Sequence, residues 1–191
     1  MIAAWSLRLP GTPKRIWADM QYITAVQLAE RPGAKELSQV ATAEHLRLVP
    51  AGLMEATLRG GDRSTLTPDE LTAADDALQR IEDAVRQAES LVDGYLARRG
   101  YNLPLNPVPE LVTGWVRDIA RYLLHKDRGG KEDTDPIVRA YRDALKFLDL
   151  TATGRFSLGA ADPIQADPNS LDVRFDASPN VFNRDQLRSY R

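Results

Sequence analysis

The fold is decided by the stretch from Thr67 to Gly100, which reads TPDELTAADDALQRIEDAVRQAESLVDGYLARRG. Thr67 is a good N-cap, Pro68 suits the first helical position because no N–H is needed there, and Glu70 completes a capping box. At the other end two arginines precede Gly100, and cations in the last turn followed by a glycine are typical of a helix C-terminus. These signals predict one helix of roughly 30 residues, about 45 Å long.

Apolar residues recur along this stretch at alternating steps of three and four, which places them on one face of a helix. They are Leu71, Ala74, Leu78, Ile81, Val85, Ala88, Val92 and Tyr95. So long a helix needs neighbouring elements to cover its apolar stripe. We therefore expect an all-α fold, a small helical bundle around one long helix at about residues 68–99.

Two more helices are predicted after the long one. They run from Pro109 to about Lys126 and from Pro136 to about Leu150, the second capped by Asp135, and each carries an apolar stripe. Residues 101–109 include three prolines that alternate with apolar residues. Because a proline disfavours helix in the residue before it, that segment is expected to be extended.

The residues before the long helix give weaker signals. Residues 20–23 suit a short strand or an extended segment, and short helices are expected over 24–30, capped by Thr24, and over 34–41. From residue 41 to 66 the apolar residues are interrupted by Pro50 and Gly52. We interpret this part as an insertion, or a loop with a partly helical turn.

Two terminal stretches of different composition flank the helical domain, which we place at residues 20–159. Residues 1–19 form an N-terminal arm, which is either a flexible terminus or an anchor on a partner; a start at Met20 would fit the same pattern. Residues 160–191 form an extended C-terminal tail rich in Asp, Asn, Pro and Ser, which should not fold alone. Its spaced apolar residues suggest that it binds along another surface: Leu171, Val173, Phe175, Val181, Phe182 and Leu187.

The overall composition excludes several classes of protein. The chain has 191 residues, 43% hydrophobic and 27% charged, which suits one globular domain with tails. No apolar run approaches the ~20 residues that cross a membrane. Cysteine is absent, so disulfides and thiolate metal sites are excluded. A net charge of -2 argues against general attraction to nucleic acid.

No catalytic constellation is found, and we expect neither an enzyme nor a cofactor or metal site. His45 and His125 are the only histidines. We expect His125 to bond a carbonyl at a helix end, and His45 to have a surface or capping role. The glycine pairs lack the strand–loop–helix context of a phosphate loop, and no nucleophile elbow or zinc-ligand spacing occurs.

Charged residues on the helices are expected to be solvated. Adjacent carboxylates on a helix point in different directions, so they do not form acid/base pairs. If the acidic face of the long helix lined a DNA passage it would repel phosphate, and the candidate channel-facing residues are Asp76, Glu82 and Asp83. A basic row on the next helix is expected to be an ordinary salt-bridged surface, or to pair with an acidic neighbour. Its members are Arg117, Arg121, Lys126 and Arg128.

Several motifs occur in an order that is similar to a known family. They are MQYITAVQLAER at 20–31, SLVDGYLARRGYNLPL at 90–105, VRDIARYLLH at 116–125, YRDALKFL at 141–148 and GRFSLG at 154–159. Over about residues 20–159 the chain resembles the head–tail connector, or head-completion, proteins of Mu-like phages. More distantly it is similar to the adaptor rings beneath the portal of long-tailed phages. The arm before Met20 and the segment 41–67 depart from this pattern.

The resemblance implies a structural adaptor of the virion without catalytic residues. Such adaptors form a ring of about twelve copies, bind below the portal protein, extend the DNA channel and dock a tail terminator or neck protein. Their C-terminal segment reaches into the portal, which would give the apolar residues of the tail a binding role. The location would be the head–tail junction, after assembly in the host cytoplasm, with no membrane contact and no sequence-specific DNA binding. The alternative is a small helical nucleic-acid-binding or regulatory protein, against which the net charge and the lack of a basic recognition helix argue.

Overall fold

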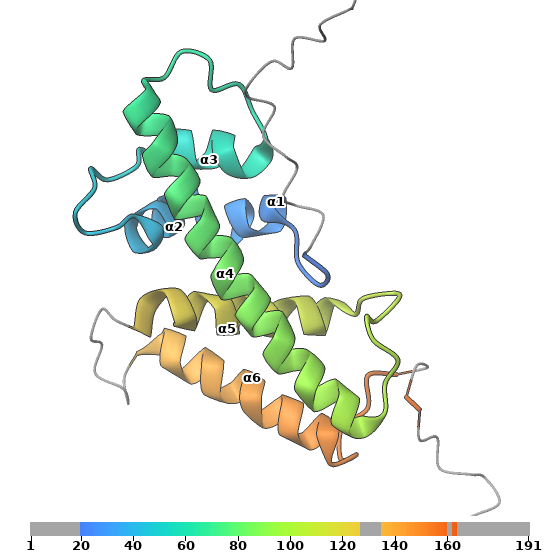
Figure 1. Ribbon diagram of the computed structural model, residues 1–191. Helices are drawn as coiled ribbons and strands as arrows, with labels where there is room; N and C mark the ends of the chain where they lie inside the picture. Colours follow the sequence, from blue (N-terminus) through green and yellow to red (C-terminus); the bar gives the residue numbers. More distant parts are fainter. Residues whose placement is uncertain (1–19, 127–134, 160–161, 164–191) are drawn as a thin grey trace, which may run out of the picture.

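The computed structural model describes residues 20–126, 135–159 and 162–163. Over these residues the chain is helical and has no strand, so the all-α prediction is confirmed. Helix α4, Pro68–Arg99, runs diagonally through the molecule, and the other helices flank its two halves (Figure 1). The N-terminal arm lies outside the described residues, as does all of the C-terminal tail except residues 162–163.

Both ends of α4 lie where the sequence predicts them. The Thr67 side chain accepts a hydrogen bond from the Glu70 N–H, and the Glu70 carboxylate accepts one from the Thr67 N–H at 3.1 Å. Gly100 takes a left-handed conformation at φ 93° and donates its N–H to the Leu96 carbonyl at 3.1 Å. Glycine adopts this conformation without the steric cost of a Cβ, which stops the helix there.

The N-terminal region, residues 20–66, consists of short helices packed on the first half of α4. They are α1 Ala25–Leu28, the π-helical turn η2 Ala29–Gly33, α2 Ala34–Ala41 and α3 Ala51–Arg59. A capping box at Thr24 starts α1 as predicted, and residues 20–23 are not a strand. The chain bends inside η2, where Arg31 leaves helical geometry at φ -147° and ψ 119°. The residues after Arg31 are Pro32 and Gly33, which interrupt helices.

The structure corrects the sequence interpretation of residues 41–66. Helix α3 lies within this segment, and Leu53, Met54 and Leu58 are buried in the same core as α4. Pro50 occupies the N-cap of α3 and Gly52 its first turn. A proline costs little at this end because the first N–H groups of a helix have no intrahelical partner. The two supposed helix breakers therefore mark the start of a helix.

The C-terminal region, residues 101–159, covers the second half of α4 with α5, Glu110–His125, and α6, Pro136–Ala152 (Figure 1). The bounds match the prediction, and Asp135 caps α6 by accepting the Ile137 N–H at 2.8 Å. Residues 101–109 are not helical, as expected from their prolines. Aromatic pairs hold α5 to α6: Tyr122 stacks on Tyr141 with ring centroids 3.9 Å apart.

One continuous core joins the two regions through α4. Five of the eight residues of the predicted stripe are buried, and Leu71, Leu78 and Tyr95 are half-buried. Small residues in the stripe and next to it let neighbouring helices approach closely: Ala74, Ala77, Ala84 and Ala88 are all buried. Among the helices of the described part, none is long and apolar enough to span a membrane.

Candidate functional site

The acidic face of α4 is less exposed than the sequence suggests. Asp76 forms an ion pair with Arg80 at 3.2 Å, and Asp83 pairs with Arg86 one turn along the helix. Glu82 is only 5% exposed and belongs to the buried side of the helix. The expectation of a solvated acidic face is therefore wrong for Glu82. Of the three candidate channel-facing residues, Asp76 and Asp83 are partly exposed and Glu82 is buried, and the channel role of the first two stays a prediction.

A second buried carboxylate holds the start of the described chain against α4. Glu89 is 5% exposed, and its Oε1 accepts the N–H groups of Gln21 and Tyr22 at 2.8 and 2.9 Å. The Tyr22 hydroxyl donates to Asp93, and the Tyr22 carbonyl accepts from Thr113 Oγ1 at 2.8 Å. We call these five residues the N-terminal clamp. It ties residues 21–22 to α4 and α5 at once.

The surroundings of the clamp shift the pKa of Glu89 and of Tyr22. Burial raises the pKa of the Glu89 carboxyl, and the two backbone N–H groups oppose that change. Burial also raises the pKa of Tyr22, and the hydrogen bond to Asp93 adds to the effect. The clamp is a structural device, because its hydrogen bonds join residues 21–22 to α4 and α5.

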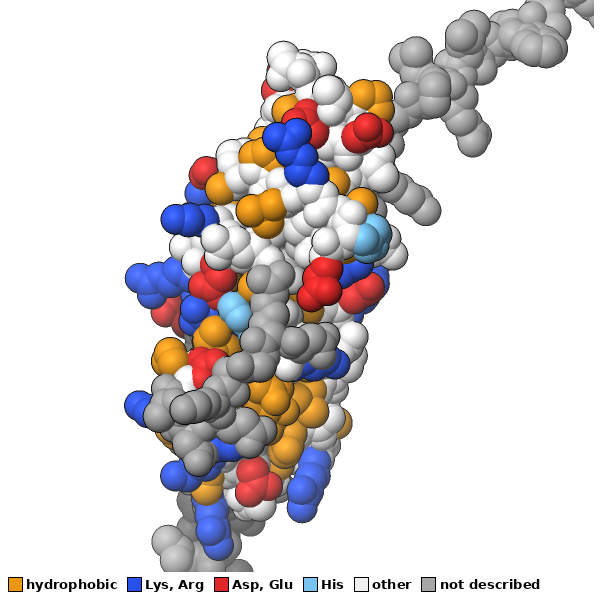
Figure 2. All heavy atoms as spheres, turned by 90° about the vertical axis from the view of Figure 1, so that its left-hand side faces the viewer, with side chains coloured by type: hydrophobic (Ala, Val, Ile, Leu, Met, Phe, Trp, Pro, Cys, Tyr) orange, Lys and Arg blue, Asp and Glu red, His pale blue; other side chains and the backbone are white. Residues whose placement is uncertain are grey.

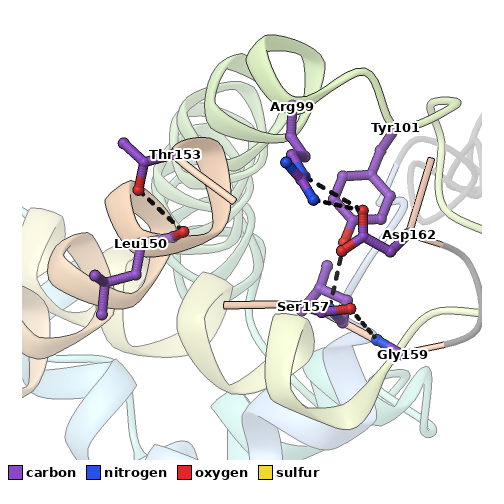
Figure 3. Close-up of polar contacts among 8 residues, drawn as sticks. Arg99, Tyr101, Leu150, Thr153, Ser157, Gly159 and Asp162 are labelled. Atoms are coloured by element: carbon purple, nitrogen blue, oxygen red, sulfur yellow. Dashed lines mark hydrogen bonds and ion pairs between the residues drawn. The ribbon is translucent and has the colours of Figure 1, made fainter. Parts of the chain in front are cut away.

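Asp162, the first described residue of the predicted C-terminal tail, is held beside the end of α4. Arg99 donates to Asp162 Oδ1 from Nε and Nη2, at 3.2 and 3.0 Å, and both side chains are largely buried. Figure 3 shows these two side chains pointing toward each other, with Tyr101 beside them. The Tyr101 hydroxyl accepts the Leu158 N–H at 3.3 Å. We call Arg99, Tyr101, Leu158 and Asp162 together the exit lock. The predicted partner-binding residues, Leu171, Val173, Phe175, Val181, Phe182 and Leu187, lie outside the described residues.

A charged cluster connects the N-terminal region to α5. Glu36 on α2 accepts from Arg121 Nε at 2.5 Å and Nη2 at 2.8 Å, and His125 Nε2 lies 3.0 Å from Glu36 Oε1. Burial alone would raise the pKa of the Glu36 carboxyl, but the hydrogen bonds from Arg121 and His125 outweigh it and hold that pKa below its usual value. The expected bond from His125 to a helix-end carbonyl is thus replaced by a carboxylate contact. His45 is exposed, in accord with a surface role.

The basic row on α5 is only partly paired. Arg121 is neutralised by Glu36, whereas Arg117 forms no ion pair with any residue that the structure describes. Both line a hollow of about 350 Å³ with Arg31, Pro32, Glu36 and Asp118. Lys126 is exposed at the end of α5, and Arg128 falls outside the described residues. Among the described members of the row, the expectation of an acidic neighbour is therefore confirmed for Arg121.

Apolar side chains remain exposed on both regions. Phe147 on α6 is 41% exposed although it lies against Trp115 and Phe156, with ring centroids 6.3 and 5.7 Å away. Figure 2 shows hydrophobic side chains gathered on the lower half of one face, below a band of mixed charges. In the part of the chain that the structure describes, the other large exposed hydrophobic residues are Val26, Leu48, Leu103 and Leu111. Exposed aromatic and aliphatic side chains are typical of protein–protein contacts.

Across residues 20–126, 135–159 and 162–163, no three His, Asp or Glu side chains converge on a potential metal position. Fold and surface together define a small all-α protein in which two regions cover one long helix, and in which Tyr22 and Asp162 are each bonded to that helix.

The chain belongs to the bacteriophage Mu Gp36 family, whose profile matches residues 22–177. It is 30% identical over 111 residues to the Mu-like prophage FluMu protein gp36 of Haemophilus influenzae, an alignment covering 58% of this chain and 75% of the relative. It is 33% identical over 113 residues to gene product J of Escherichia phage Mu, covering 59% and 75%. No solved structure matches the chain. The predicted resemblance to Mu-like phage proteins is therefore confirmed.

The family match extends beyond the range predicted from the motifs. It includes residues 41–66, which the motif pattern left out, and agrees with the burial of α3 in the core. It also continues past the exit lock into the tail as far as residue 177. Leu171, Val173 and Phe175 therefore lie inside the family region, whereas Val181, Phe182 and Leu187 lie beyond it.

Proposed function

We propose that the protein is a structural component of a Mu-like phage virion, an adaptor at the head–tail junction. In this role it binds below the portal protein as a ring of about twelve copies, extends the DNA channel and docks a tail terminator or neck protein. It acts by binding, without catalysis or a cofactor. Assembly takes place in the host cytoplasm, and DNA passes through the ring without sequence-specific contact.

The observation that carries this proposal is the combination of the exit lock with the family match. Asp162 is held beside the end of α4 by Arg99. The family region nevertheless continues for further residues, to 177. A segment of this kind, polar but with regularly spaced apolar residues, suits binding along a groove or sheet edge of a partner.

The exposed apolar residues and the charge of α4 support the same role. Phe147 and Leu111 are more than a third exposed, which suits contacts with neighbouring subunits or the tail. Asp76 and Asp83 would keep DNA phosphates from binding a channel wall.

Replacing both Asp76 and Asp83 by Lys should slow DNA release from particles. Unchanged release would show that these residues do not face the channel.

The proposed portal contact is tested by mutating two groups of apolar tail residues in separate variants. Leu171, Val173 and Phe175 are replaced by Ser in one variant, and Val181, Phe182 and Leu187 in a second variant, which tests whether the contact extends beyond the family region that ends at residue 177. We expect the first variant to keep the helical circular dichroism spectrum and melting temperature of the wild type but to lose co-sedimentation with portal-containing heads. Deleting residues 171–191 should have the same effect. Attachment of the deleted chain to heads would show that the tail is not the anchor.

The location is tested by labelling the protein in purified particles and finding the label by electron microscopy. We expect it at the head–tail junction of every particle. Absence of the protein from virions would reject the structural role, and would favour a protein that acts during infection instead.

A further inference from the structure

We infer that the hollow between η2 and α5 is a carboxylate-binding site, which takes a single Asp or Glu side chain from a partner protein. The site is lined by Arg31, Pro32, Glu36, Arg117, Asp118 and Arg121 and measures about 350 Å³. This inference goes beyond the adaptor role, because it does not depend on where in the particle the chain is located.

The arrangement of charges leaves two guanidinium groups available. Glu36 is occupied, since Arg121 donates to both of its oxygens and His125 contacts Oε1 at 3.0 Å. Arg31 and Arg117 have no carboxylate within ion-pair distance among the residues that the structure describes. The Asp118 carboxylate interacts electrostatically with Arg117 but forms no ion pair with it, so the N–H donors of Arg31 and Arg117 remain for an incoming acceptor.

The fold brings these two arginines together from distant parts of the sequence. Arg31 stands at the bend in η2, where it leaves helical geometry, and Arg117 lies on the second turn of α5. The bond between Glu36 and Arg121 holds α2 against α5 next to them. The hollow is therefore built across the junction of the N-terminal region and α5, and an anion there would contact both.

The balance of charge favours one carboxylate over a polyanion. Three arginines and two carboxylates line the hollow, so one negative charge is enough to neutralise the excess. Glu36 and Asp118 in the walls would repel the further charges of a nucleic acid backbone. A recess also admits one protruding side chain, whereas duplex DNA presents a row of phosphates along a broad surface. Paired guanidinium forks match the planar geometry of a carboxylate.

The test is an NMR titration of the ¹⁵N-labelled full chain, following the arginine side-chain Nε–H signals. The probe is a short capped neutral peptide with one central Glu, and the matched probe carries Gln instead. We expect the Glu peptide to shift the signals of Arg31 and Arg117 with millimolar affinity, about -4 kcal/mol or weaker, and the Gln peptide to leave them in place.

Variants distinguish binding of the Glu peptide in the hollow from its nonspecific electrostatic attraction to the protein. Arg117→Gln and Arg31→Gln should each weaken binding of the Glu peptide about tenfold, and two variants are used in case one fails to fold. Arg139→Gln removes the same charge from the exposed face of α6 and should leave binding unchanged.

The inference is wrong if the Glu peptide shifts neither the Arg31 nor the Arg117 signal, or if the Gln peptide shifts them equally. It is also wrong if Arg139→Gln weakens binding as much as the two site variants do. A short DNA duplex that shifts both signals at lower concentration, and needs Arg117 to do so, would also overturn it in favour of a phosphate site.

Discussion

The N-terminal and C-terminal regions cover two halves of the same helix in different ways. The N-terminal region uses short helices broken by bends, and its buried hydroxyls bond to backbone carbonyls: Ser38 Oγ donates to Val49 and Thr57 Oγ1 to Leu53, both at 2.8 Å. The C-terminal region uses two longer helices joined by stacked aromatic rings. Both regions bury apolar side chains in the same core, and α6 also has a buried hydroxyl bond, from Thr151 Oγ1 to the Phe147 carbonyl at 2.8 Å. The regions therefore differ in helix length and in aromatic contacts between helices.

The largest effect is expected where both regions meet on α4. Ile81 is fully buried in the middle of that helix. Ile81→Asp should unfold both regions together, because an unpaired buried carboxylate costs upward of ~4 kcal/mol, against a total stability of ~5–15 kcal/mol. Circular dichroism and thermal melting measure the loss. Gln79→Asp, two residues away and exposed, is the control and should melt like the wild type. Retained helicity in Ile81→Asp would mean that the stripe is not core.

Matched cavities test whether the two regions unfold as one unit. Met54 on α3 and Leu148 on α6 are both fully buried. Their replacement by Ala should cost about 2–5 kcal/mol each. Because the core is continuous through α4, we expect a single urea transition for both variants and faster hydrogen exchange in both regions. Exchange that rises only in α1 to α3 after Met54→Ala would show two separate units. Arg139→Ala on the exposed face of α6 is the control.

The difference between the two regions also determines which helices could be predicted from the sequence. Helices α4, α5 and α6 were predictable because their caps and apolar stripes are local patterns. Helix α3 was not, because Pro50 and Gly52 break the pattern when read locally and only the structure places them at a helix start. In the N-terminal region, tertiary packing decides what the local signals leave open.

The sequence also did not predict which charged residues are buried or what they contact. Glu82 and Glu89 lie on a helix rich in exposed acids, and periodicity alone does not distinguish them. Glu89 is covered by residues 21–22, which are more than sixty residues away in the chain. The contact between His125 and Glu36 spans 89 residues, so no spacing rule could find it. Such contacts depend on which helices become neighbours, and that information is not local.

The link between the two regions can be weakened at Glu36. Glu36→Gln removes the charge that Arg121 and His125 share, and should cost about 1–2 kcal/mol at neutral pH. Since the folded pKa of Glu36 lies below its ordinary value of 4.5, its stabilisation is present above that value and is lost as the pH falls through the folded pKa. Urea unfolding from pH 7 to 3 should show the difference between wild type and Glu36→Gln shrinking with acid. A constant difference would mean that the charge of Glu36 does not link the regions.

Glu89 in the N-terminal clamp should respond to acid in the opposite direction, with the smallest effect. Burial raises its folded pKa above 4.5, so the folded state binds the proton more readily than the unfolded state. Its contribution is therefore fully present below 4.5 and is lost as the pH rises through the folded pKa. Glu89→Gln keeps an oxygen that accepts the N–H groups of Gln21 and Tyr22, so at neutral pH we expect a change within about 1 kcal/mol.

The measurement is the same urea series, run on wild type, Glu36→Gln and Glu89→Gln together. On acidification toward 4.5 the wild type should gain stability relative to Glu89→Gln, while it loses stability relative to Glu36→Gln. The two carboxylates differ because Glu36 is held by cations, whereas Glu89 is buried and accepts only backbone N–H groups. If both differences moved in the same direction, the clamp would be a second ionic link, and the two attachments of the N-terminal region would not be physically distinct.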